Sequence, residues 1–461
     1  MEQAAQEERS GAVGESKPRI GFWRRNRIDC ALVVLALAVM APIVAENNAQ
    51  PASRLDLTAS LVEHHSVDIS GYPIGVDYSR YHGFRSDKAP GQPILTTPFY
   101  ALAKVVGAES ASHLRQKKNL TLWWMTLWSA TIPFALLLVL MRRTAARFVS
   151  GRTALVATLA LGFCTLLAPY AVNLYGHVMA ALFAFGAWSL LSRSDGDVRR
   201  LLLAGILVGL AVFVEYEAAV VALVLLVYTA VSFRSRVGWY LLGGIPGVLA
   251  LTSYQWIAFG APWHTPQASY AGNVNGQPAN GVRLPFAHVG ELLWNPSRSL
   301  LIVSPLVLVA VGCAVVAARQ ASGGVRAQAW VALGVFVGYV LVVASSQATT
   351  MREHPGPRFL VVAIPFLIVP LAVMWDRVRA LALISSVWGG FFMAMATLSS
   401  LLLGMDEPLL HAYVNRITHH SFSPTLWSMS IGDAGSVFYL ATVVAAILLL
   451  RRSASATQLA T

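Results

Sequence analysis

The residues of this chain best suited to chemistry lie in one short segment, Asp77–Pro93, with the sequence DYSRYHGFRSDKAPGQP. It holds two acids and three bases: Asp77, Asp87, Arg80, Arg85 and Lys88. A carboxylate can accept a proton as a general base, and a lysine or arginine can neutralise a phosphate. Because the whole chain is only 12% charged and 56% hydrophobic, charge this dense indicates a binding or catalytic site. A merely solvated loop would not need the aromatic residues and the rigid Ala-Pro-Gly-Gln-Pro run.

Membrane helices must position this segment. The mean hydropathy is +0.59, and apolar runs recur near the length of ~20 residues that spans a bilayer. The sequence therefore predicts an all-α polytopic membrane protein with about twelve transmembrane helices. The candidate spans are 28–46, 120–141, 153–170, 174–191, 200–216, 217–233, 238–258, 299–317, 329–346, 358–375, 380–403 and 435–450.

Short basic connections set the predicted orientation. Four of them are Met141–Arg147, Phe233–Arg236, Trp375–Arg379 and Arg451–Ser453. Basic residues favour the cytoplasmic side, so both termini are predicted inside a bacterial plasma (inner) membrane, with the active site on the outer or periplasmic face. The net charge of +12 then reflects topology and contact with membrane lipids rather than with nucleic acid.

The outer connections are the long ones. We expect a disordered cytoplasmic tail at 1–27, a transmembrane domain at 28–450 with outer loops at 47–119, 259–298 and 404–434, and a cytoplasmic tail at 451–461. Two amphipathic surface helices are predicted in the first outer loop. One is Ser53–His65, with Ser53 as its N-cap, and the other is Pro93–Val106, which Pro98 should interrupt.

Several motifs between Arg54 and about Pro370 follow one pattern. The first outer loop has Arg-Leu near its start, then Ser-Asp-Lys-Ala-Pro-Gly and Pro-Phe-Tyr-Ala-Leu. Weaker matches follow at Leu174–His177, Val214–Tyr216, Asn295–Arg298 and Gly356–Leu360. The pattern resembles the polyprenyl-phosphate-dependent glycosyltransferases of the GT-C fold, which include lipid A aminoarabinose transferases and protein O-mannosyltransferases.

This resemblance implies a hexosyl- or pentosyltransferase. It would move a sugar from a polyprenyl-monophosphate donor to a hydroxyl of a lipid, glycan or protein acceptor on the outer face. Attack opposite the leaving phosphate would invert the anomeric carbon. The implied reaction requires no cofactor.

The resemblance also implies roles for particular residues. Lys88 matches the family's phosphate-contacting lysine, Asp87 the acid before it, and Arg54 the arginine of the first surface helix. Arg85 and Arg358 are further candidates for the donor phosphate. Where the aminoarabinose transferases place a catalytic aspartate, this chain has Pro51, so the base is expected among three carboxylates in this order of preference: Asp77, Asp87 and Asp56.

Other polar residues near the outer face are candidates for substrate binding: Tyr81, His177, Glu215 and Arg298. Each also has a structural interpretation, as a hydrogen-bonded helix end, an interfacial acid or a snorkelling anchor. Three bases that lie outside against the charge rule suggest a lipid-phosphate contact: Arg115, Lys117 and Lys118. Four histidines, His64, His65, His419 and His420, form adjacent pairs rather than the i, i+4 spacing of a helical metal site, which predicts no tightly bound structural metal.

Alternative functions remain open at this point. A multi-span transporter or lipid-linked sugar flippase would share the predicted topology but would carry polar groups near the bilayer midplane. A glycan ligase or polymerase would use a diphosphate carrier instead of a monophosphate. A non-catalytic membrane scaffold would leave the charges between Asp77 and Lys88 unexplained.

Overall fold

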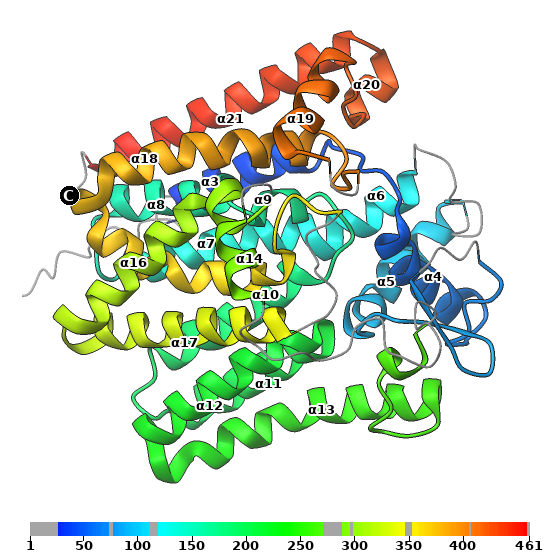
Figure 1. Cartoon of the computed structure of the whole chain (residues 1–461), viewed down its shortest axis with the longest axis horizontal. Coiled ribbons are helices and arrows are strands. Elements are labelled where there is room, and N and C mark those ends of the chain that lie inside the picture. The colour runs from blue at the N-terminus through cyan, green and yellow to red at the C-terminus, as the bar shows by residue number, and fades with distance from the viewer. Residues whose placement is uncertain are drawn as a thin grey trace, which may run out of the picture.

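The computed structural model describes residues 26–72, 77–109, 119–270, 288–295, 298–345, 353–404 and 407–458. Long helices run side by side through most of the molecule (Figure 1). The first-loop helices α4 and α5 gather at one end, at the right of the view, and the turn between α12 and α13 lies at the other. The predicted tail at 1–27 falls almost wholly outside the described residues, as do Arg115, Lys117 and Lys118.

The first described elements are one apolar helix and the segment predicted as the first outer loop. These elements are α3 (Arg27–Met40), α4 (Ala49–Glu63), β1 (Tyr78–Arg80), β2 (Phe84–Ser86) and α5 (Gly91–Val105). A continuous helical stretch follows, made of α6 (Leu120–Thr126), the π-helical turn η2 (Leu127–Thr131) and α7 (Ile132–Ala145).

The middle of the chain supplies most of the bundle. Its elements are α8 (Gly151–Phe163), α9 (Leu167–Tyr170), α10 (His177–Leu191), α11 (Val198–Val214), η3 (Tyr216–Ala218), α12 (Ala219–Phe233), η4 (Arg234–Arg236), α13 (Val237–Phe259) and η5 (Pro266–Ser269). His177 begins α10 and Glu215 caps the end of α11, so the two residues lie at the same end of these neighbouring helices.

The last part of the chain packs against the elements of the first and middle parts. It comprises α14 (Val289–Trp294), α15 (Leu300–Val303), α16 (Pro305–Gln320), α17 (Gly323–Ser345), η6 (Arg358–Leu367), α18 (Ile368–Leu398), α19 (Leu409–Thr418), α20 (Leu426–Ile431) and α21 (Ala434–Gln458). Helix α21 runs beyond residue 450, so the predicted tail at 451–461 begins as helix.

Among the residues that the structure describes, five helical stretches are long and apolar enough to cross a membrane: Leu120–Ala145, Tyr216–Phe259, Gly323–Ser345, Arg358–Leu398 and Ala434–Ser455. Shorter apolar helices are Gly151–Phe163, His177–Leu191 and Pro305–Gln320. The stretch Tyr216–Phe259 has 44 residues and would measure about 66 Å if it were straight, twice the thickness of the hydrocarbon core of a bilayer. It is broken at Arg234, where φ is 22°, so α12 and α13 form two antiparallel helices. The predicted number of spans stays a prediction.

Several predicted boundaries are wrong. Trp375–Arg379, predicted as an inside loop, is helical within α18, whose ribbon changes direction at the left of the view (Figure 1). Charged residues do not by themselves end a helix, because Arg and Asp can extend their side chains from it. The predicted span 153–170 is interrupted after Phe163, and the span 299–317 is interrupted at Ser304, ahead of Pro305.

Helix α4 does not lie on the membrane as a surface helix. Ten consecutive residues, from Pro51 to Ser60, are buried, so polar and apolar faces are both covered. Its N-cap is Asn48, whose side chain accepts a hydrogen bond from the backbone N–H of Gln50, rather than Ser53. Helix α5 forms as predicted but continues through Pro98, because the helix tolerates the missing N–H there.

A two-stranded hairpin follows α4, which the all-α prediction did not include. Strands β1 and β2 pair antiparallel, with Tyr78 opposite Ser86. The chain reverses through His82 and Gly83, both at positive φ, and a Cβ at Gly83 would approach the Asp68 carboxylate to 2.5 Å. The hairpin carries Asp77 at its start and Asp87 and Lys88 just after its end.

Candidate active site

Lys88 lies between two carboxylates at the end of the hairpin. Its Nζ is 2.7 Å from Asp87 Oδ2 and 3.2 Å from Asp77 Oδ2. Burial raises the pKa of Asp87, the charge of Lys88 opposes that rise, and the nearby Asp77 carboxylate adds to it. Of the two carboxylates, Asp77 is the more accessible, with 11% of its side chain exposed against 3% for Asp87.

Helix α4 supports Asp87 and the end of the hairpin through Ser53. Ser53 Oγ donates a hydrogen bond to Asp87 Oδ1 at 3.3 Å and lies 2.8 Å from Ser86 Oγ. The next residue along α4 is Arg54, so one turn of a buried helix supports the loop and presents a guanidinium beside it. This contact explains why α4 must be buried rather than exposed to lipid.

Arg54 forms a buried ion pair with Glu215 at the end of α11. Arg54 Nη2 is 2.8 Å from Glu215 Oε1, and His177 Nδ1 is 3.5 Å from the same oxygen. The close approach depends on Gly176, because a Cβ there would be 2.4 Å from Glu215 Oε1. The Nε and Nη1 groups of Arg54 are buried and have no hydrogen-bond partner among the residues that the structure describes.

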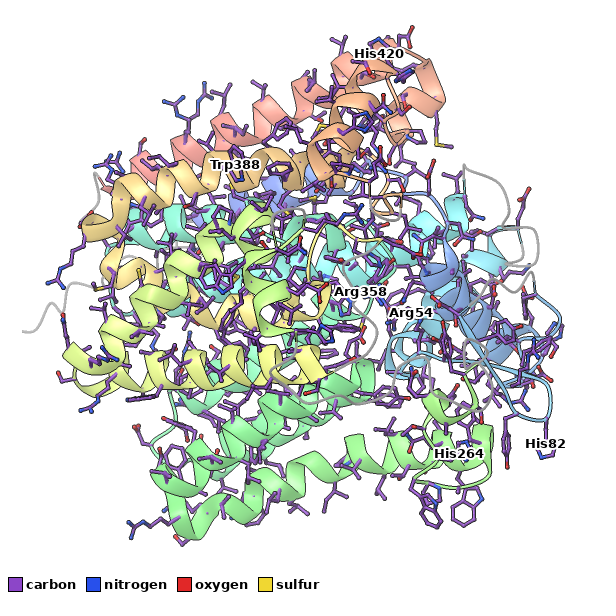
Figure 2. All side chains as sticks on the ribbon, in the orientation of Figure 1. Arg54, His82, His264, Arg358, Trp388 and His420 are labelled. Atoms are coloured by element: carbon purple, nitrogen blue, oxygen red, sulfur yellow. The ribbon has the colours of Figure 1, made fainter. Side chains whose placement is uncertain are left out.

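Arg358, at the start of η6, brings a third cation to this group. It bonds His354 and places its guanidinium 5.0 Å from the centre of the Phe359 ring. Glu215 is within electrostatic reach of Arg54, Arg358 and Lys88 together. Figure 2 shows Arg54 and Arg358 close to each other near the centre of the molecule. Arg358 Nε is a further buried N–H group that lacks a partner within the described ranges.

Aromatic rings surround the histidines. Tyr175 has His177 on one side and His354 on the other, each with its ring centre 5.9 Å away. The Tyr175 hydroxyl donates to Asn48 Oδ1 at 3.3 Å, which ties this turn to the start of α4. Burial, with the charge of Arg358 next, holds the pKa of His354 well below its usual range. A neutral His354 can therefore accept the hydrogen bond from Arg358.

The segment after α13 also reaches the site. Ser79 of β1 forms a β-bridge with Tyr270, and Ser79 Oγ donates to the Pro266 carbonyl at 2.7 Å. This pairing carries the Tyr270 hydroxyl to within 3.4 Å of Asp77 Oδ1. The segments that follow α4 and α13 therefore meet at the preferred candidate base.

Seven of the residues proposed from sequence form one group, which we call the charged cluster: Arg54, Asp77, Asp87, Lys88, His177, Glu215 and Arg358. It combines three cations, three carboxylates and a histidine, and it keeps several cationic N–H groups free. Such an arrangement suits a ligand that carries a buried negative charge.

The other proposed residues make different contacts. Asp56 lies on the opposite face of α4 from Arg54, near Tyr72, and burial raises its pKa to about 8. Arg85 pairs with Asp68 at 3.1 Å and donates to the Ala258 carbonyl. The Tyr81 ring contacts those of Phe259 and His264. Arg298 donates to the carbonyls of Gly404 and Glu407, both at 2.7 Å.

Sequence reasoning did not single out Ser53, Tyr175, Tyr270 and His354 as members of the site. Ser53 had a weak signal, because it precedes Arg54 in a segment already suspected of phosphate binding. Tyr270 had none, since 193 residues separate it from Asp77. His354 is four residues before Arg358, a spacing that places two side chains on one side of a helical turn.

No protein-family model matches the sequence, and a search of curated proteins finds no match. Solved structures do match. ArnT from Cupriavidus metallidurans bound to undecaprenyl phosphate is 16% identical over 93% of this chain and 72% of ArnT, with a TM-score of 0.50. The apo oligosaccharyltransferase of Archaeoglobus fulgidus is 11% identical over 91% of this chain and 60% of its own, with a TM-score of 0.45. Arabinosyltransferase EmbB from Mycobacterium smegmatis is 14% identical over 98% of this chain and 43% of its own, with a TM-score of 0.44.

The likeness to ArnT shows the fold. The predicted fold class is confirmed in its coarse form, a helical and polytopic membrane protein, and so is the resemblance stated from the motifs. The chain is an integral membrane protein with the GT-C fold.

Proposed function

We propose that the protein is a membrane glycosyltransferase that moves a sugar from a polyprenyl-monophosphate donor to an acceptor hydroxyl. The reaction takes place on the outer face of a bacterial plasma membrane and inverts the anomeric carbon. The fold shared with ArnT, whose structure holds undecaprenyl phosphate, supports this proposal. The charged cluster supports it independently.

The observation that carries the proposal is the set of buried cationic N–H groups without partners. Arg54 contributes two and Arg358 one, as far as the structure describes their surroundings. Leaving a buried donor unpaired costs about 1–3 kcal/mol, and more for a charged group. A phosphate oxygen would satisfy these donors and match their charge. Lys88, whose ammonium lies between Asp77 and Asp87, would be the third cation on the leaving phosphate.

The carboxylates accept the proton of the acceptor hydroxyl and hold the cations in position. The acceptor oxygen attacks the anomeric carbon, the bond from that carbon to the phosphate oxygen breaks, and the hydroxyl proton passes to a carboxylate. We assign this proton to Asp77, because its side chain is 11% exposed, whereas Asp87 is 3% exposed and is held by Lys88 and Ser53. Arg54, Lys88 and Arg358 stabilise the charge that develops on the leaving phosphate. Asp87 supports Lys88, and Glu215 supports Arg54.

Donor binding by variants of Lys88 tests the proposal. A charge-assisted hydrogen bond contributes roughly 1.5–3 kcal/mol, so Lys88→Ala should weaken binding of a polyprenyl-monophosphate sugar by about ten- to a hundredfold. Lys88→Arg should recover only part of the loss, because a planar guanidinium does not replace a compact ammonium. A matched control is Lys104→Ala, since Lys104 pairs with Glu63 outside the charged cluster.

Mass spectrometry of lipids that co-purify with the protein gives a second test. A polyprenyl monophosphate sugar is the expected ligand. Unchanged donor affinity in Lys88→Ala would remove the phosphate role. Preferential binding of a diphosphate-linked glycan would instead indicate a ligase or polymerase, and substrate-driven flux across liposomes without transfer would indicate a transporter.

A further inference from the structure

A second group of cations lies at the other end of α10 and α11. Helix α10 runs from His177, in the charged cluster, to Leu191, about 22 Å away along the helix axis. The loop 192–197 then leads into α11, which returns to Glu215. Figure 1 places the nearby turn between α12 and α13 at the end of the molecule opposite α4 and α5.

Arginines from three elements bind the backbone of this loop. Arg147, after α7, donates to the Ser192 carbonyl at 2.8 Å and to Ser192 Oγ at 3.0 Å. Arg200 donates to the carbonyl of Arg193, and Arg236 to that of Gly196 at 2.5 Å. We call Arg147, Arg193, Arg200 and Arg236 the arginine cluster.

The acids nearby do not neutralise this cluster. Asp29 already holds Arg142 and Arg143, at 2.5 and 2.6 Å, and Asp197 lies 3.6 Å from Arg200. Asp195, within the loop, is exposed and forms no ion pair with a described residue. Within the described part of the chain, Arg147 and Arg193 form no ion pair. Burial, and then the charge of neighbouring arginines, lowers the pKa of both.

Like charges held this close repel one another unless an anion lies between them. The tendency of basic residues to stay on the cytoplasmic side explains why arginines occur at this end, but it does not require them to converge on one loop. Hydrogen bonds to carbonyls fix their positions without cancelling their charge. The cluster is therefore built to accept a negative group from outside the chain.

The surroundings of the cluster identify that group. Leu203 on α11 and Val231 on α12 are exposed apolar side chains, and α12 belongs to the apolar stretch Tyr216–Phe259. The Arg147 guanidinium also lies 5.3 Å from the centre of the Phe148 ring. We expect an anionic group that binds beside such an apolar surface to belong to a lipid, whose acyl chains would contact these side chains.

We propose that the arginine cluster binds the phosphate headgroup of an anionic phospholipid, in the leaflet opposite the charged cluster. Recognition uses the charge of Arg147 and Arg193 and the N–H groups of the arginines that line the loop 192–197. This site is independent of the proposed transferase activity, and its test requires no turnover.

Native mass spectrometry of the full chain in neutral detergent tests the site, with phosphatidylglycerol and phosphatidylcholine as probes. We expect one phosphatidylglycerol to stay bound at concentrations where phosphatidylcholine does not. Arg193→Gln should weaken this binding by about fivefold, and Arg147→Gln with Arg193→Gln by about twentyfold. No described residue accepts a hydrogen bond from the Arg193 side chain, so the single variant should fold normally.

The control removes two arginines from the same side of the protein but outside the cluster, as Arg152→Gln with Arg319→Gln. This control should bind phosphatidylglycerol like the unaltered protein. Equal loss in the control and in the cluster variants would show general charge attraction and would overturn the proposal. Displacement of phosphatidylglycerol by millimolar inorganic phosphate would assign the site to a soluble anion and would also overturn it.

Discussion

Two groups of acids and arginines, one partly exposed and one buried, differ in how completely the arginine N–H groups are used. At the start of α3, Asp29 receives Arg142 on one oxygen and Arg143 on the other, and the second nitrogen of Arg143 bonds Asn26 at 2.8 Å. In the charged cluster, Arg54 gives one nitrogen to Glu215 and leaves two buried N–H groups without described partners.

The difference separates a structural ion pair from a candidate binding site. Removing charges from water costs free energy, which the Asp29 group offsets with hydrogen bonds inside the chain. The hydrogen bonds of the Arg54 group offset only part of this desolvation cost, although the Arg54 guanidinium is buried. We infer that the first group joins α3 to α7, and that the second is completed by a ligand.

Asp77→Asn should separate the two groups most clearly. The variant removes the proposed proton acceptor but keeps its size and polarity, so turnover should fall by about a hundred- to ten-thousandfold. Donor affinity should stay close to that of the unaltered protein, because Arg54, Lys88 and Arg358 remain. A reconstituted transfer assay and a separate binding assay measure the two quantities.

The matched control is Asp29→Asn. It should lower the thermal unfolding midpoint by releasing Arg142 and Arg143, while each folded molecule keeps its turnover. If Asp77→Asn turned over normally and Asp87→Asn did not, the base would be misassigned although the enzyme class would stand. Loss of turnover in Asp29→Asn would remove the contrast between the two groups.

Gly176→Ala should have the next largest effect. Its Cβ would lie 2.4 Å from Glu215 Oε1, so the carboxylate must move away from Arg54. Crowding of this kind costs about 1–3 kcal/mol, which predicts a loss of roughly tenfold in donor affinity. The control is Gly312→Ala in α16, where a Cβ meets nothing within 4 Å. Donor affinity equal in both variants would show that the position of Glu215 does not matter.

Tyr270→Phe should reduce turnover more modestly. It removes one hydrogen bond to Asp77, worth about 0.5–1.5 kcal/mol, and so predicts a loss of twofold to tenfold. Tyr72→Phe is the control, since it removes a similar bond to Glu63 outside the charged cluster. Turnover equal to that of the unaltered protein would exclude a positioning role for Tyr270.

Local contacts of the site could be predicted from the sequence, and distant ones could not. Asp87 and Lys88 are neighbours in one loop, so their pairing follows from composition and spacing. The contact between Arg54 and Glu215 joins residues 161 positions apart, and it depends on how α4 and α11 pack. Hydropathy identifies the helices but says little about which of their ends meet.

The errors have physical causes of the same kind. Helix α4 is predicted at the membrane surface because apolar residues share one of its faces, yet Ser53 and Arg54 are buried by their contacts with Asp87 and Glu215. Arg85 was assigned to phosphate from its place in the charged segment. In the structure its guanidinium is paired with Asp68 and backbone carbonyls. Charge in a sequence shows that a partner is needed, and only the fold shows which one.

Of these variants, Asp56→Asn should change turnover least. Its main effect should be on how the stability of the fold depends on pH. Burial raises the pKa of Asp56 from 3.8 to about 8, so the folded protein keeps a proton that the unfolded chain has released above pH 4. Stability should therefore fall as the pH rises from about 4 to 8, and asparagine, which is always neutral, should remove that fall. At pH 7.5 the variant should be more stable by at least about 1.4 kcal/mol, the equivalent of one pKa unit.

Thermal unfolding of Asp56→Asn and of the unaltered protein between pH 4 and 8 measures the slope of stability against pH, and transfer assays at pH 7.5 measure turnover. A variant that is inactive but normally folded would make Asp56 the base in place of Asp77, whereas an unchanged slope would show that Asp56 is already ionised in the folded protein.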